Sequence, residues 1–280
     1  MPSILTRFPE FRKKALTLSY DDGVVEDRHL IEIIDKYKIK ATFNLISNTY
    51  TEAGYDDDNQ RLSRHEAIEL YKNSPHEVAI HSHNHPWLAQ IPSGVDAWEI
   101  IKNREILEEM FGRIVNGMAY PEGSYDERVI RMLKSCGVEY ARCVATKKDN
   151  PGLHKFDLPN DWYNWNGTCR HRDPELMTIA EEFLSAKIRG DSKLFYLWGH
   201  SYEFDRHNNW DSIENFCKLM GNNDAIWYAT NGEICSYIKA SQQIKAASNG
   251  TILHNPTAKR LWLEIDSKNF ILNAGDTLYL

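Results

Sequence analysis

The chain has 280 residues, of which 42% are hydrophobic, so it can bury the core of one large α/β domain or two small ones. Its formal net charge is -7 and its basic residues form no stripe, which argues against nucleic acid or an anionic membrane as a partner. No run of about 18 apolar residues predicts membrane insertion. Residues 1–14 lack a signal-peptide-like run, so we expect a cytoplasmic protein, with an exported form whose leader was removed left open.

The cysteines predict free thiols. Their number is odd and no Cys-x-x-Cys pair occurs, so neither a zinc knuckle nor a complete disulfide framework is indicated. They are Cys136, Cys143, Cys169, Cys217 and Cys235.

Short apolar runs alternate with segments of helical period, which is typical of strand-helix units that feed a parallel sheet. No Gly-x-Gly-x-x-Gly follows the first strand, so we favour a β/α barrel over an open doubly wound sheet. In such a barrel the active-site residues follow the C-terminal ends of the strands. The predicted strands are Ala15–Tyr20, Ala41–Leu45, Glu77–His81, Val115–Tyr120, Val138–Val144, Leu194–Gly199 and Ala225–Ala229.

Start and stop signals support the intervening helices. Ser63 with Glu66 forms one expected capping box, and Ser124 with Glu127 forms another. Two longer helices are expected at 95–111 and 174–187. Gly112 and Gly137 are placed as C-caps, each just before the next strand.

The end of the chain changes character from about Asn249. Residues 261–265 and 270–272 have the pattern of short strands around a polar turn at 266–269. This pattern predicts a small C-terminal β appendage.

The first strand ends in Ser19-Tyr20-Asp21-Asp22-Gly23. Neighbouring residues of a strand point to opposite faces, so both carboxylates reach one site only if the strand breaks at Gly23. An ordinary solvated turn is the alternative.

The third strand runs into His81-Ser82-His83-Asn84-His85-Pro86. His81 and His85 have a spacing suited to one metal ion and lie at the same barrel end as Asp21 and Asp22. His83 would project elsewhere, as a surface or supporting imidazole.

Three weaker signals follow later strands. His200 ends the sixth strand, either as a hydrogen-bonded rim residue or as a catalytic group. Ala119-Tyr120-Pro121-Glu122-Gly123 follows the fourth strand and could be a simple chain reversal. Trp162 and Trp165 stand among Asn and Asp residues, a pattern that suits either sugar stacking or a loop core.

Taken in order, these segments resemble the NodB-like polysaccharide deacetylases, carbohydrate esterase family four. Residues 19–23 match the family's Thr-Phe-Asp-Asp-Gly, and residues 81–86 match His-(Ser/Thr)-x-x-His-Pro. The resemblance implies a distorted (β/α)7 TIM-like barrel over residues 1–240, followed by the small β extension at 241–280.

By the same resemblance, Asp21 is the general base and His200 the general acid. Asp22, His81 and His85 are the ligands of one divalent metal ion, Zn²⁺ first and Co²⁺, Ni²⁺, Mn²⁺ or Fe²⁺ as alternatives. The implied activity is hydrolytic removal of acetyl groups from carbohydrate: from N-acetylated sugars at a carbon-nitrogen bond other than a peptide bond, or from O-acetylated sugars.

The third motif departs from the family, because Ala119 replaces the arginine that tethers the base. Arg142, at the end of the fifth strand, is our candidate replacement. The fourth motif is poorly matched. The expected substrate-binding residues are Tyr120, whose backbone N–H is a candidate oxyanion donor, Pro121, Glu122, Trp162 and Trp165.

Other functions stay open at this point. An allantoinase-like hydrolase of a small cyclic amide shares the fold, and an inactive sugar-binding barrel would explain Ala119. A non-haem iron oxygenase also uses two histidines and a carboxylate, but usually on another fold. A glycosidase is disfavoured because adjacent carboxylates cannot flank a bond at the required ~5 Å.

Overall fold

The structure is a computed structural model that describes residues 2–50, 61–144 and 155–280. Its centre is a nine-stranded sheet in the order β7-β6-β5-β4-β3-β2-β9-β8, with β10 also paired to β2. All these neighbours are parallel, and the sheet curls into a half-barrel. The strands are β2 (Lys14–Asp22), β3 (Ala41–Leu45), β4 (Glu77–Ile80), β5 (Gly117–Ala119), β6 (Tyr140–Cys143), β7 (Trp165–Asn166), β8 (Cys169–Arg170), β9 (Lys193–Gly199) and β10 (Ile226–Tyr228).

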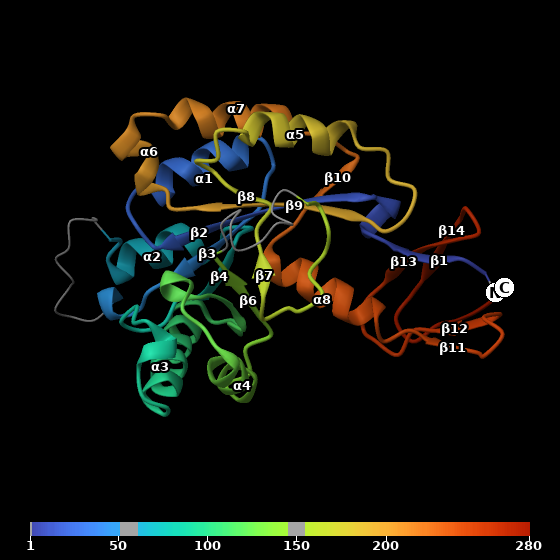
Figure 1. Ribbon diagram of the computed structural model, residues 1–280, viewed down its shortest axis with the longest axis horizontal. Coiled ribbons are helices and arrows are strands. Elements are labelled where there is room, and N and C mark those ends of the chain that lie inside the picture. Colours follow the sequence, from blue (N-terminus) through green and yellow to red (C-terminus); the bar gives the residue numbers. More distant parts are fainter. Residues whose placement is uncertain (1, 51–60, 145–154) are drawn as a thin grey trace.

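Helices cover the outside of this sheet, with α1, α5 and α7 on one side in Figure 1 and α3 and α4 on the other. The predicted barrel class is therefore confirmed, and all seven predicted strands are found. The short strands β7 and β8 were not predicted. The helices are α1 (Asp27–Lys36), α2 (Arg64–Tyr71), α3 (Val95–Phe111), α4 (Glu127–Ser135), α5 (Leu176–Ser185), α6 (Tyr202–His207), α7 (Trp210–Met220) and α8 (Asn231–Ser241), with 3-10 turns η1 (Pro9–Phe11), η2 (Asn48–Tyr50), η3 (Leu88–Gln90) and η4 (Pro121–Gly123).

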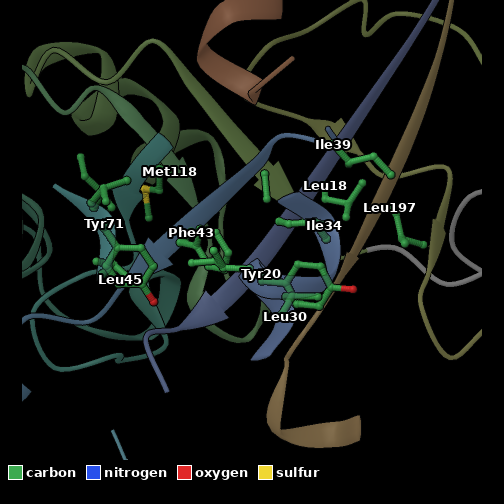
Figure 2. Close-up of a cluster of buried hydrophobic side chains, with 14 of the residues drawn as sticks. Leu18, Tyr20, Leu30, Ile34, Ile39, Phe43, Leu45, Tyr71, Met118 and Leu197 are labelled. Carbon is green, nitrogen blue, oxygen red and sulfur yellow. The ribbon is translucent and has the colours of Figure 1, made fainter. Parts of the chain in front are cut away.

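The two faces of β2 differ in polarity. Leu16, Leu18 and Tyr20 belong to the main hydrophobic cluster, which also contains Leu30 and Ile34 of α1. Figure 2 shows Leu18 and Tyr20 among these side chains. The alternate residues Thr17, Ser19 and Asp21 are buried polar groups on the opposite face. This face of β2 therefore carries polar groups that lead towards its C-terminal end.

Local signals set several helix ends. Ser63 and Glu66 form the expected reciprocal capping box of α2, and Gly112 ends α3 in the left-handed conformation. The second expected capping box is wrong, because Asp126 accepts the Val129 N–H and caps α4. The Ser124 hydroxyl instead accepts the Ala89 N–H.

Both ends of the chain meet in the predicted β appendage. β13 (Leu261–Ile265) pairs with β14 (Lys268–Leu272) and with β1 (Ile4–Arg7), all antiparallel. β11 (Lys245–Ala246), β12 (Ile252–His254) and β15 (Thr277–Tyr279) form a second small sheet. The domain boundary at residue 240 stays a prediction.

All five cysteines are free, in agreement with the sequence. Among the described residues, no helix is both long and apolar enough to cross a membrane. The cytoplasmic location stays a prediction.

Candidate metal centre and active site

The end of β2 turns sharply, so that two consecutive carboxylates face one pocket. Asp21 points inward by strand alternation, and Asp22 follows it with a φ of +83°. Gly23 has a φ of +73°, and a Cβ there would lie 2.8 Å from the Tyr50 hydroxyl. Only glycine fits this turn without strain, as the sequence pattern predicted.

The two histidines after β4 converge because their loop folds back on itself. Ser82 and His85 both have left-handed φ values, and the Ser82 hydroxyl accepts the His85 N–H at 2.9 Å. The Nε2 atoms of His81 and His85 lie 3.2 Å apart. Asp22 Oδ1 lies 3.6 Å from His81 Nε2 and 3.9 Å from His85 Nε2. The donor atoms of the three predicted ligands therefore lie close enough together to bind one ion.

Neighbouring groups fix the orientation of His81. Its Nδ1 lies 2.8 Å from the Ala119 carbonyl oxygen, which can only accept, so Nδ1 carries the proton and Nε2 presents its lone pair to the pocket. Asn103 accepts the His81 N–H and donates to the Leu45 carbonyl. Burial, partly offset by Asp21, lowers the pKa of His81 to about 4, so the ring is neutral at pH 7.

The three side chains fit a divalent cation. Asp22 Oδ1 is buried without a hydrogen-bond partner, an arrangement that costs free energy unless a cation or donor compensates it. The candidate ligand atoms of Asp22, His81 and His85 all lie within 4.8 Å of one another. Two imidazoles and one carboxylate are a common donor set for Zn²⁺ and similar ions, with positions left for water and substrate.

Asp21 is held by two donors. Its Oδ1 accepts from Asn44 Nδ2 at 2.8 Å, and its Oδ2 forms an ion pair with the buried guanidinium of Arg142. Burial by itself would raise the pKa of Asp21, but the charges of Arg142, His81 and His200 outweigh it and lower the pKa to about 2. The carboxylate is therefore ionised at neutral pH.

The register of β5 and β6 explains how Arg142 reaches Asp21. Arg142 on β6 pairs directly with Ala119 on β5, the position where the resembling family has its arginine. Its guanidinium lies over the Trp198 ring, 4.6 Å from the centroid. The structure thus brings the sequence-predicted candidate Arg142 to Asp21 from the neighbouring strand.

His200 directly follows β9, the strand that pairs with the Asp21-bearing strand β2. Its Nε2 lies 3.8 Å from Asp21 Oδ2, and its Nδ1 lies 3.7 Å from Glu203 Oε2. Burial by itself would lower the pKa of His200, but Glu203, Asp21 and Asp22 outweigh it and raise the pKa. A protonated ring, the state a general acid requires, is thereby favoured.

Glu203 was not singled out from the sequence. Its carboxylate forms ion pairs with Arg170, Arg172 and His171, whose Nε2 lies 2.8 Å from Glu203 Oε2. A signal was present: Glu203 stands three residues after His200, one helical turn away, and residues 170–172 are three consecutive basic side chains. Sequence reasoning missed it because the strand β8 that presents these residues has only two residues.

The pocket around these groups has a volume of about 290 Å³. Tyr120 and Glu122 line it, and Glu122 Oε1 lies 4.0 Å from His85 Nδ1; that they bind substrate stays a prediction. Pro121 is buried behind them at the start of η4. The lining residues are Asp21, Asp22, His81, His85, Tyr120, Glu122, Val144, Arg170, Trp198, His200 and Tyr202.

Two substrate-binding expectations need correction. Trp162 and Trp165 pack edge to face in a hydrophobic cluster, with Trp165 only 1% exposed, so neither lines this pocket. Trp198 supplies its aromatic wall instead. The Tyr120 N–H donates to the Arg142 carbonyl at 3.0 Å, so it is not the expected oxyanion donor.

The fold and the site define a β/α half-barrel in which the Asp22–His81–His85 cluster lies beside Asp21 and His200. Residues 9–141 match the family model for polysaccharide deacetylase, a stretch that contains Asp21 and the three candidate ligands. The match identifies this stretch of the chain as a polysaccharide deacetylase domain, and solved structures of such deacetylases share its fold. Arg142 and His200 lie beyond the matched stretch.

Individual relatives support this assignment. The chain is 24% identical over 161 residues to the poly-beta-1,6-N-acetyl-D-glucosamine N-deacetylase of Staphylococcus aureus, and the alignment covers 54% of each chain. The chain thus spans about half the length of that relative. A family 4 carbohydrate esterase from Streptomyces lividans in complex with acetate shares the fold, with 13% identity, a TM-score of 0.51 and coverage of 77% of this chain and 91% of that one. A peptidoglycan deacetylase from Bacillus subtilis matches at 16% identity and a TM-score of 0.50, over 82% and 93%.

Proposed function

We propose that this protein is a metal-dependent hydrolase that removes acetyl groups from N-acetylated carbohydrate. The observation that carries the proposal is the convergence of Asp22, His81 and His85 with Asp21 and His200 in one pocket. A relative that acts on poly-beta-1,6-N-acetyl-D-glucosamine supports an N-acetyl sugar polymer as the substrate class.

The metal would be held by Asp22, His81 and His85, with Zn²⁺ as the first candidate. A divalent ion bound there supplies Lewis-acid polarisation of the acetyl carbonyl and lowers the pKa of water towards neutrality.

The residues of the chain supply the proton transfers. Asp21, kept ionised by Arg142, takes a proton from the attacking water, whose oxygen bonds to the acetyl carbonyl carbon. His200, held at Nδ1 by Glu203, donates its Nε2 proton to the sugar nitrogen as the carbon-nitrogen bond breaks. The products are acetate and a free amine. An O-acetyl sugar would react by the same steps, with an alcohol as the leaving group.

The loss of the family arginine at Ala119 does not favour an inactive barrel, because Arg142 makes the ion pair with Asp21. A small cyclic amide as substrate has no comparable observation in its favour. Acetate release distinguishes these possibilities directly.

The test is acetate release from β-1,6- and β-1,4-linked N-acetylglucosamine oligomers, with and without a chelator and with metal added back. We expect activity that the chelator abolishes and the metal restores. Asp21→Asn and His200→Ala should each lower turnover by about 10² to 10⁴-fold, the usual contribution of a positioned acid or base, and both should retain metal. Full turnover in Asp21→Asn, or acetate release that resists chelation, would contradict the proposal.

A further inference from the structure

A buried carboxyl group outside the pocket connects the two strand ends that carry the proposed chemistry. Asp27 is the first residue of α1, and its side chain is fully buried. Asp27 Oδ1 accepts the Ser201 hydroxyl at 2.5 Å, and Oδ2 accepts the Tyr71 hydroxyl at 2.6 Å. Each carboxyl oxygen therefore has one hydroxyl donor, and the donors come from different elements.

The Ser201 contact joins the acid to the base and the metal ligands. Ser201 directly follows His200 and begins the first turn of α6, in which Glu203 N–H donates to the His200 carbonyl and Phe204 N–H to the Ser201 carbonyl. Asp27 begins α1 immediately after the turn that holds Asp22 and Gly23, and its N–H donates to Val24. The Asp27–Ser201 bond thus ties the turn after β9 to the turn after β2.

The Tyr71 contact has no such connection. Tyr71 is the last residue of α2, and its ring packs against Phe43 in the hydrophobic cluster, so its hydroxyl reaches Asp27 from an element that carries none of the proposed catalytic residues. A carboxyl group at a helix start also favours the helix dipole, so Asp27 has a structural role in either case. Removing the Ser201 hydroxyl therefore tests the positioning of His200, whereas removing the Tyr71 hydroxyl tests only the packing around Asp27.

We propose that Asp27 and Ser201 are positioning residues that hold His200 at its working distance from Asp21 and from the metal ligands. The inference rests on the proposed role of His200 as proton donor to the leaving group. Glu203 and Arg170 lie 3.7 Å and 3.4 Å from the His200 Nδ1, whereas the Asp27–Ser201 bond holds the backbone that carries the ring. Misplacement of a catalytic group by about 1 Å can cost on the order of 10²-fold in rate.

The test compares Ser201→Ala with Tyr71→Phe, because each removes one hydroxyl donor to the same carboxyl group. Turnover is measured on an N-acetylglucosamine oligomer, whose amine must be protonated to leave, and on 4-nitrophenyl acetate, whose phenolate leaves without a proton. For Ser201→Ala we expect kcat on the oligomer to fall about 10 to 100-fold, with KM and metal content unchanged and a loss below about 3-fold on the aryl ester. Tyr71→Phe should lose less than about 3-fold on both substrates. Asp27→Asn, which keeps the shape but replaces one acceptor by a donor, should behave like Ser201→Ala.

Equal losses in Ser201→Ala and Tyr71→Phe, or a Ser201→Ala loss that is the same on both substrates, would overturn the inference. His200→Ala is the reference, because a missing acid must produce the leaving-group dependence in its largest form. If His200→Ala shows no such dependence, the proposed function of His200 is wrong. If His200→Ala shows it and Ser201→Ala does not, only the positioning role fails.

Discussion

The two ends of β4 carry the same residue types and use them differently. At its start, Glu77 accepts hydrogen bonds from Thr42, Tyr140 and the Gly232 N–H, and His76 Nδ1 accepts the Ala41 N–H. At its other end, His81 and His85 follow β4, and their Nε2 atoms face Asp22 Oδ1 at the end of β2, which lacks a hydrogen-bond partner. His76 Nε2 is also buried without a hydrogen-bond partner, with Asp35 Oδ1 3.2 Å away, so an unsatisfied nitrogen does not by itself mark a site. The two ends differ because a carboxylate oxygen and two imidazole nitrogens converge at Asp22, His81 and His85.

Cavity size does not distinguish these ends. The cavity beside His76 and Glu77 has a volume of about 410 Å³, larger than the pocket of about 290 Å³ at the metal-type triad. Strand direction does distinguish them, because the loops after the C-terminal strand ends are free to vary while the opposite end holds the barrel together. Four predictions sharpen this contrast.

The largest effect is expected from His81→Ala. Loss of this ligand should remove the metal and lower acetate release by about 10³-fold or more, since metal catalysis is worth several kcal/mol and each 1.36 kcal/mol is tenfold in rate. Elemental analysis and acetate release measure both effects. His83→Ala is the matched control, because His83 Nδ1 lies 2.9 Å from the Ser47 hydroxyl, away from the triad, and this variant should keep metal and turnover. Metal retained in His81→Ala would contradict the ligand set.

Arg142→Met should change both pH dependence and stability. Without the guanidinium, burial raises the pKa of Asp21, so the acidic limb of the kcat/KM profile should move to higher pH and activity should recover as pH rises. Breaking a buried ion pair should also cost about 3 to 5 kcal/mol in the free energy of unfolding. Arg142→Lys keeps the charge without the planar guanidinium, so its acidic limb and its free energy of unfolding should lie between those of the wild type and Arg142→Met. An unchanged acidic limb would show that Arg142 does not control Asp21.

His76 should make stability depend on pH at the structural end. Burial, with Lys40 and Arg113 nearby, lowers the pKa of His76 from 6.5 to about 4. The unfolded chain binds a proton at His76 more tightly than the folded chain does. The stability that neutral His76 contributes is therefore fully present above pH 6.5 and is lost as the pH falls towards 4, by at most about 3 kcal/mol.

Urea unfolding at several pH values measures this contribution as the difference between the wild type and His76→Gln. The two stability curves should converge as pH falls from 6.5 to 4. Parallel curves would argue against a neutral, buried His76.

The smallest effect is expected from Tyr140→Phe. This change removes one of the donors to Glu77 and should cost about 1 kcal/mol of stability, with acetate release unchanged. Thermal unfolding and turnover together provide the check. A large loss of turnover would show that the two ends of the half-barrel are coupled.

The sequence by itself determined seven of the nine strands of the main sheet and the positions of Asp21, Asp22, His81, His85 and His200 at strand ends. Period-two alternation, capping signals and the Gly23 turn are local features, and parallel strands bring their C-terminal ends to one rim. Their assembly at one rim therefore needed no knowledge of distant contacts.

Only the tertiary structure decided which residues support that assembly. Arg142 reaches Asp21 because β5 and β6 pair in one register, and Glu203 meets residues 170–172 because β8 pairs with β9. Strand β8 has two residues, too few for a periodic signal, and exists through its partner's hydrogen bonds. The choice of Trp198 over Trp162 and Trp165 likewise depends on which face each strand buries. Register and burial are non-local, because residues far apart in the chain set them together.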